Sequence, residues 1–542
     1  MSPPAVEARR PNGRRLLAAA IALAVAASAV GCSGAEESEP APTTEAGFRP
    51  GGTLRLGVAG STALDPALAV PTEQAEMIAV DLLYDSLATD ANPAEPDLAE
   101  SFQPSEDHRR WRIVLRDRAF ADGSPITAED VKFTLERLAR QGSASLAGTR
   151  LDIVAGYEAL AVERSASELS GVRVLDQRTL EIDLGVSYTQ LPELLGSPLY
   201  GIVPRAAVQA AGDRFGDQPV GSGPYRFVGR DGSVVRLERA PGPAGEAAGP
   251  DTVELVGFDT VADSYAAFEE GRVDWSLVPP ERETLAEAAA KYGNGAFRSF
   301  GAELWFGINQ HDPAYADVRF RRAIVAAIDR EGIARRVFAG RLPLRGLVAA
   351  GVQGAADDAC ATACAYDLDE ARALLAEVFG GGPVTTTVVL DTYDDPSQIE
   401  LIEAITADLQ AVGIPVEHRV KPFEEYRSFV VSGEPDVFSF GWVGINPTQE
   451  AYLGPPFLSG SRDNVVGVSS EAVDAAITRA RATPEAEARD SLYREAEQRL
   501  LGDGVAIPVV QLMTNQVIAP RVNGFAGRLD GTFDVASLWL AD

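Results

Sequence analysis

Residues 99–138 read AESFQPSEDHRRWRIVLRDRAFADGSPITAEDVKFTLERL, and this stretch decides the fold. Apolar side chains recur at every second position of 111–115, which is the spacing of a strand with one face on a core. The segment 121–125 (ADGSP) has the composition of a tight turn. Thr127 stands three residues before an aspartate and an apolar run, so a capped helix is predicted from Ala128. The stretch therefore predicts a strand, a turn and a helix in succession.

The order and spacing of these motifs resemble the family 5 extracellular solute-binding proteins, the receptors of peptide, nickel and related ABC importers. Three further segments resemble the same family: the strand 51–58 (GGTLRLGV), the turn and strand 219–227 (PVGSGPYRF) and the helix 317–333 (DVRFRRAIVAAIDREGI). The resemblance extends from about Gly51 to about Gln511.

The resemblance implies an α/β fold of the periplasmic-binding-protein type II class (cluster C), with two lobes, an extra inserted domain and a hinge. Residues 383–420 support an α/β fold independently, because strand, helix and strand in that length require a parallel crossover. The expected parts are a discontinuous lobe I (51–87, 181–276 and 505–542), an inserted domain II (88–180) and a lobe II (277–504).

Composition excludes several classes of function. The chain has 542 residues, of which 46% are apolar and 23% charged, and these proportions are typical of a globular protein. Its formal net charge of −31 argues against nucleic-acid binding. The three histidines are scattered without the spacing of metal ligands, and no nucleophile elbow occurs, so we expect no enzyme, no metal site and no cofactor. We also expect the protein to be a monomer.

The first 31 residues have the features of a secretory signal peptide: arginines, an apolar run over 16–30, and small residues before Cys32. The motif resembles a bacterial lipobox, although Ala29 stands where leucine is commonest. Residues 32–50 then predict a lipidated Cys32 and a flexible acidic tether. The expected location is the outer face of the cell membrane, periplasmic or extracytoplasmic. An ordinary secreted protein, in which Cys32 is incidental, is the alternative.

Cys360 and Cys364 follow a glycine-rich loop. In an exported chain they predict a small structural disulfide, with free thiols as the alternative.

The resemblance also indicates ligand-binding residues. In similar peptide receptors a Gly-Trp pair lies along the ligand, and Gly441 and Trp442 match it at the end of the predicted strand 436–442. Val443 and Ile445, which follow this pair, are expected to contact the ligand as well. Trp305 and Asn309 end another predicted strand and are expected at the same cleft, because ligands bind beyond the carboxyl ends of such strands.

The sequence departs from the family pattern after Trp442. Peptide receptors continue Trp-x-x-Asp, whose aspartate holds the ligand's ammonium, whereas here Val443 and Gly444 precede Ile445. The ligand therefore lacks a free amine, or its charge is met elsewhere, for example by Glu73 or Glu450.

These features together predict a membrane-tethered receptor that captures a small peptide or peptide-like solute and passes it to an ABC permease with its ATPase. A peptide sensor without transport and an exported hydrolase on a receptor-like fold are the alternatives.

Overall fold

The computed structural model describes residues 51–60, 62–242, 249–293, 297–338 and 343–541. All of them belong to one compact unit that begins at Phe48. The predicted signal peptide, Cys32 and the acidic tether lie outside the described residues.

The opening stretch folds as predicted, into β2 (Ala99–Pro104), β3 (Arg110–Leu115) and α2 (Ala128–Gln141). The Thr127 hydroxyl accepts a hydrogen bond from the Asp130 backbone N–H at 3.4 Å, and the Asp130 carboxylate accepts one from the Thr127 N–H at 2.9 Å. This reciprocal cap satisfies two N–H groups that would otherwise lack partners at the start of α2. With β4 (Val172–Asp176) and β5 (Thr179–Asp183), these strands form a four-stranded sheet in the order β2-β3-β5-β4.

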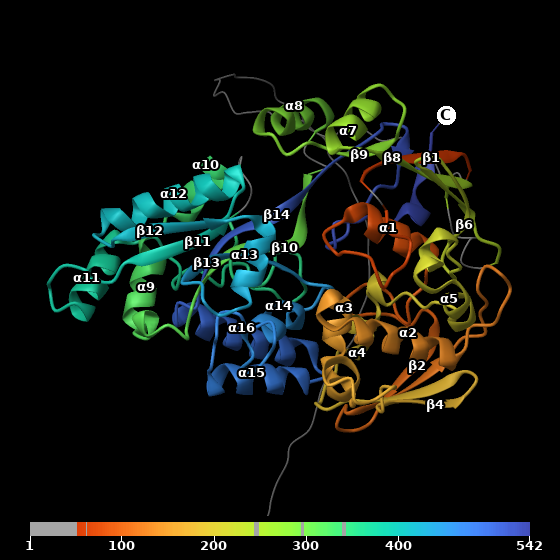
Figure 1. Ribbon diagram of the computed structural model, residues 1–542, viewed down its shortest axis with the longest axis horizontal. Helices are drawn as coiled ribbons and strands as arrows, with labels where there is room; N and C mark the ends of the chain where they lie inside the picture. The colour runs from red at the N-terminus through yellow and green to blue at the C-terminus, as the bar shows by residue number, and fades with distance from the viewer. Residues whose placement is uncertain (1–50, 61, 243–248, 294–296, 339–342, 542) are drawn as a thin grey trace, which may run out of the picture. The chain divides into compact units, whose positions relative to one another are not determined.

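The largest of the described sheets has ten strands, which lie in both the left and the right parts of the view in Figure 1. Its order is β12 (Val416–Lys421), β11 (Val388–Tyr393), β13 (Val437–Val443), β10 (Phe297–Ile308), β14 (Ala506–Ile518), β9 (Trp275–Leu277), β1 (Thr53–Ala59), β8 (Thr252–Phe258), β7 (Val234–Arg239) and β6 (Tyr225–Asp231). We call β12, β11, β13 and β10 the β13 half, and β9, β1, β8, β7 and β6 the β1 half.

The long strand β14 joins the two halves. Its first part pairs with β10 in the β13 half, and Gln516, Val517 and Ile518 pair with β9 in the β1 half. A second passage from the β1 half to the β13 half runs from β9 through α8 (Arg282–Tyr292) toward β10. The halves are thus connected by two passages of backbone.

Helices cover the sheets. Those not yet named are α1 (Gln74–Leu83), α3 (Leu146–Thr149), α4 (Leu191–Leu195), α5 (Arg205–Ala211), α7 (Val261–Glu269), α9 (Val318–Ala327), α10 (Arg330–Val337), α11 (Leu368–Val378), α12 (Pro396–Ala411), α13 (Phe423–Val430), α14 (Glu450–Phe457), α15 (Glu471–Arg481) and α16 (Ala486–Gly502). Separate apolar cores lie in the β13 half, around β1, and between α2 and the four-stranded sheet. Among the described helices, none is long and apolar enough to cross a membrane.

The predicted strand-helix-strand unit is confirmed, since β11 and β12 pair in parallel across α12. The sequence predicts a capping box of Ser397 with Glu400 for this helix, and that prediction is wrong. Asp395 caps α12, and its carboxylate accepts from the N–H groups of Ser397 and Gln398. Proline favours the first helical position, so Pro396 moves the helix start ahead of Ser397.

Two other predicted helix starts and one helix length also differ. The sequence predicts one helix from Ser264 and another with Pro484 at its first position. In the structure, Thr260 caps α7 ahead of Ser264, and Glu485 precedes α16, which leaves Pro484 outside the helix. The predicted long helix from Asp317 ends at Ala327, because Asp329 caps the new helix α10.

Candidate functional site

One side of β13 lacks a strand partner along its second half. On the β10 side, β13 is paired from Val437 to Val443. On the β11 side the register covers only Leu390 with Val437 and Asp391 with Phe438. Beyond that point, β13 has an open edge within the described residues.

The backbone groups that face this open edge follow from strand alternation. The Gly444 N–H donates to the Gly301 carbonyl at 3.2 Å, so the even-numbered residues of β13 hydrogen-bond to β10. The N–H and C=O groups of Gly441 and Val443 therefore point away from β10. The Ser439 carbonyl points the same way and accepts from the Tyr426 hydroxyl at 2.6 Å. Gly441 is exposed and has no side chain to cover this edge.

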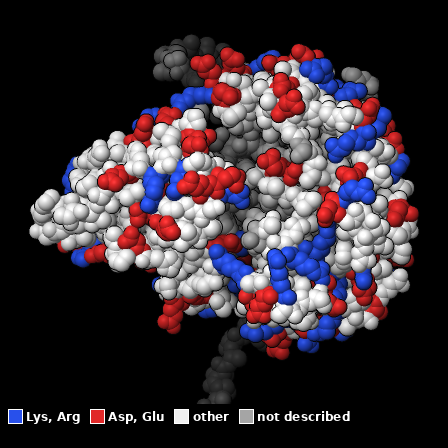
Figure 2. Space-filling view, viewed as in Figure 1, with Lys and Arg blue, Asp and Glu red and all other residues white. Residues whose placement is uncertain are grey.

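A cavity of about 460 Å³ lies against the open edge. Its wall is mostly apolar and aromatic: Thr72, Ala302, Glu303, Tyr393, Phe423, Tyr426, Arg427, Val430, Val431, Ser439, Phe440, Gly441, Trp442, Val443 and Leu512. Thr72 precedes α1 and comes from the β1 side, whereas the other residues come from the β13 half and β14. Figure 2 shows a hollow on one face of the molecule whose wall is largely free of charged side chains.

The cavity continues toward the β1 half. A second cavity of about 310 Å³ shares Thr72 and includes Glu73, Trp275 and Met513. Glu73 precedes α1 and is exposed, and its side chain makes no capping hydrogen bond. Its carboxylate is thus available beside the second cavity.

Trp442 is held on both sides. Its indole N–H donates to the Ala451 carbonyl at 2.8 Å, and its ring stacks on Phe440 with 6.1 Å between centroids. The guanidinium of Arg150 lies 5.2 Å from the ring centroid and pairs with Asp463 at 2.6 Å. These contacts fix the strand end whose backbone lines the cavity.

Trp305 and Asn309 do not line the cavity beside Gly441. Trp305 is 1% exposed and packs between Phe440 and Phe457. The Asn309 amide donates to the carbonyls of Gly433 and Pro435, in the loop that leads into β13. Neither residue lines the cavity beside Gly441, and both help to position β13.

Ile445 and Glu450 lie at a different cavity, of about 360 Å³. Ile445 is buried and packs in the apolar core beside the four-stranded sheet. Glu450 accepts from Arg481 Nε at 2.9 Å and from the Tyr493 hydroxyl at 2.9 Å. Since these groups already balance Glu450, it is a poor acceptor for a ligand ammonium.

The wall formed by α13 was not predicted from the sequence. Phe423, Tyr426 and Val430 line the cavity from this helix, and Tyr393 joins them from the end of β11. The spacing of three and four residues from 423 to 430 is that of one helical face. This spacing is the sequence pattern that could have indicated the wall, and the apolar Val431 follows it directly.

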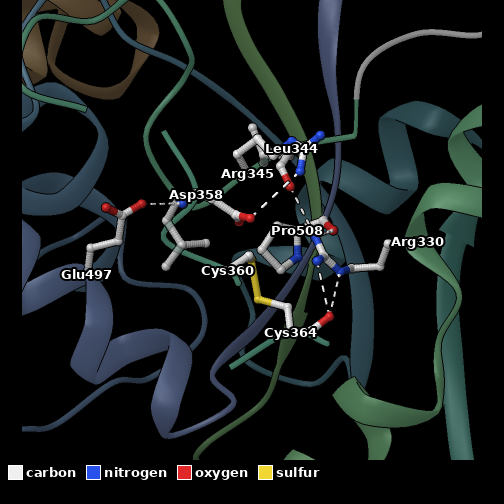
Figure 3. Close-up of a disulfide and its surroundings, with 9 residues drawn as sticks. Arg330, Leu344, Arg345, Asp358, Cys360, Cys364, Glu497 and Pro508 are labelled. Atoms are coloured by element: carbon white, nitrogen blue, oxygen red, sulfur yellow. Dashed lines mark hydrogen bonds and ion pairs between the residues drawn. A yellow bond between two sulfur atoms is a disulfide. The ribbon is translucent and has the colours of Figure 1, made fainter. Parts of the chain in front are cut away.

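The disulfide of Cys360 and Cys364 lies outside this wall (Figure 3). The Arg330 guanidinium donates to the carbonyls of Cys364, Leu344 and Pro508, at 3.1, 3.0 and 3.3 Å. Burial lowers the pKa of Arg330 to about 10. The disulfide and Arg330 thus tie the 344–364 loop to β14. Among the described residues, no group of three or more acidic, histidine or cysteine side chains is placed to hold a metal ion.

Two buried carboxyl groups lie behind β13. Glu303 stands opposite Trp442 in β10, is 1% exposed, and its Oε1 has no hydrogen-bond partner among the described residues. Burial, and then the charge of Glu497, raise the pKa of Glu303 well above its usual range. Burial also raises the pKa of Glu497 to about 7, although its Oε1 accepts from the Leu347 N–H at 2.6 Å.

The raised pKa of Glu497 predicts a pH-dependent stability. Between about pH 4.5 and 7 the folded chain keeps a proton that the unfolded chain has lost, so stability falls as the pH rises through this window. Glu497→Gln removes the carboxyl group whose ionisation causes this fall in stability. Urea unfolding should find the variant more stable than the parent at pH 8, by on the order of 3 kcal/mol, and equal to it at pH 4.

Glu487→Gln, on the exposed side of the same helix, is the matched control and should leave the pH profile unchanged. A constant difference between the Glu497→Gln variant and the parent from pH 4 to pH 8 would contradict the assignment.

Comparisons with known proteins bear on this site. Residues 94–464 match the model of the bacterial extracellular solute-binding proteins, family 5. The periplasmic oligopeptide-binding protein OppA of Escherichia coli K12 is 25% identical over 465 residues, which cover 82% of this chain and 84% of OppA. The probable deoxycholate-binding periplasmic protein YgiS of the same organism is 24% identical over 477 residues, 85% of this chain and 88% of YgiS.

A solved structure supports the fold. The periplasmic murein tripeptide-binding protein MppA, in its unliganded open form, superimposes with a TM-score of 0.76 at 20% identity. The match covers 91% of this chain and 99% of MppA. The predicted periplasmic-binding-protein fold class is thereby confirmed.

Proposed function

The chain belongs to the bacterial extracellular solute-binding proteins of family 5, and from this premise we propose that it captures small peptides or peptide-like solutes beside β13 for an ABC importer. The family consists of binding proteins, so the prediction that the chain is not an enzyme is confirmed and the hydrolase alternative is set aside. OppA carries peptide binding in its name, and MppA is named for a murein tripeptide.

The open edge of β13 is the observation that carries the proposal. Gly441 and Val443 line a cavity, and in the part of the chain that the structure describes their outward N–H and C=O groups have no strand partner. An extended peptide can add to such an edge, because its own backbone supplies the missing donors and acceptors. Main-chain pairing of this kind depends little on sequence, and the cavity wall then meets the peptide's side chains.

A small apolar molecule is the second candidate ligand. The wall is largely apolar, and the relative YgiS is named as a probable deoxycholate binder. A steroid would use this wall but would leave the backbone edge without partners. The exposed edge therefore favours a peptide.

The open edge predicts the effect of a side chain at position 441. A Cβ placed on Gly441 meets only the Glu303 carbonyl, at 3.7 Å, so the fold tolerates a larger residue there. Gly441→Val should fill the space beside the edge and weaken binding of a ligand peptide at least tenfold in titration calorimetry, with an unchanged melting temperature.

Gly229→Val is the matched control, because Gly229 lies in β6 and a Cβ at this position would have no neighbouring atom within 4 Å. This variant should bind like the parent. Unchanged affinity in Gly441→Val would contradict a ligand along β13.

Anchoring follows from Cys32, the tether and the export signal, and we propose a lipid anchor on the outer face of the cell membrane. Residues 33–47 are small, acidic and proline-bearing, and a segment of this composition lets an anchored receptor reach a permease. One acyl chain binds a membrane marginally, so firm attachment requires the additional chains of a bacterial lipoprotein.

The anchor is tested by Cys32→Ser, which removes the thiol that lipid would modify. The variant should leave the membrane fraction and appear in the soluble exported fraction. Ser33→Ala, at the next position, is the control and should stay with the membrane. Membrane retention of Cys32→Ser would contradict the lipid assignment.

A further inference from the structure

We propose that the cavity beside β13 receives one large apolar or aromatic side chain of the bound peptide, so that the protein selects peptides that carry such a residue. The inference rests on the proposed function and names the substrate class of the same site. Its basis is the chemistry of the wall that α13 and β11 present.

Aromatic rings form this wall. Tyr393 and Phe423 meet edge to face with 5.0 Å between ring centroids, and Tyr393 and Tyr426 lie 5.6 Å apart. The Tyr426 hydroxyl donates to the Ser439 carbonyl at 2.6 Å and lies 3.1 Å from the Asp391 carbonyl, which fixes its ring. A preformed aromatic surface binds an apolar side chain with little loss of its own freedom.

The same wall exposes apolar surface to solvent. Phe423 is 49% exposed and Val431 is 73% exposed, and both line the cavity. Exposed apolar residues gathered around a hollow are typical of a binding site rather than of an inert surface.

The carboxyl group of the wall does not offer a partner to a cationic ligand side chain. Arg427 lies 5.9 Å from the centroid of Phe423 and pairs with Glu424 at 3.5 Å. Glu303 is buried, and burial favours its neutral form. A lysine inserted here would lose water without gaining an ionised carboxylate as a partner, which is unfavourable.

The pocket is continuous with the open edge. β11 and β13 pair only as far as Asp391 and Phe438, and residues beyond these points, Tyr393 and Ser439 among them, line the cavity. A peptide strand paired with Gly441 and Val443 would enter this gap. Since side chains alternate along a strand, every second one would face the wall of α13.

The test is titration calorimetry of the full chain with pentaalanine and two substitution series. In one series phenylalanine replaces each alanine in turn, and in the other lysine does. Phenylalanine at one position should bind at least tenfold tighter than pentaalanine, and lysine at that position should bind weaker than pentaalanine. The gain corresponds to burial of one aromatic side chain.

Val431→Asp should abolish the phenylalanine preference, because it places a charge in the apolar wall. Val318→Asp, a control at an exposed valine of α9, should keep the preference. Equal affinity for all the peptides would contradict the proposed apolar side-chain pocket but would be consistent with the proposed capture of peptides. Binding of deoxycholate with no binding of any peptide would overturn both.

Discussion

The site depends on one feature of backbone hydrogen bonding: β13 is paired along both sides at its start and along one side at its end. β11 leaves the β13 ladder after Asp391, so the N–H and C=O groups of Gly441 and Val443 that face away from β10 have no strand partner among the described residues. Unpaired edges inside a cavity are costly unless water or a ligand satisfies them. A ligand with its own backbone is the natural partner for such an edge.

The rest of the β13 half holds this edge in place. Trp305 and Asn309 support β13 from the core and from the loop before it. Arg150, from the chain between α3 and β4, covers the Trp442 ring and pairs with Asp463. The long strand β14 then connects this half to the half that supplies Thr72 and Glu73. These contacts hold the open edge of β13 in place. The residues that line the two cavities come from both the β13 half and the β1 half of the sheet.

Local chemistry made much of the fold predictable. Thr127 with Asp130 fixed the start of α2, and the apolar spacing of 383–420 fixed a parallel crossover. Helix starts were less certain where two capping residues compete, as Asp395 does with Ser397. For the site, the Gly441-Trp442 motif pointed to the end of β13. The wall from α13 was missed because its packing against β11 depends on residues distant in sequence.

Amide hydrogen exchange at single-residue resolution distinguishes the paired side of β13 from its open edge. In the free protein, the amides of Gly441 and Val443 should exchange faster than that of Trp442, which bonds to β10. A saturating peptide should then slow Gly441 and Val443 and leave Gly229 of β6 unchanged. Equal protection of all three β13 amides in the free protein, or no change at Gly441 and Val443 on saturation, would contradict a peptide-binding edge on β13.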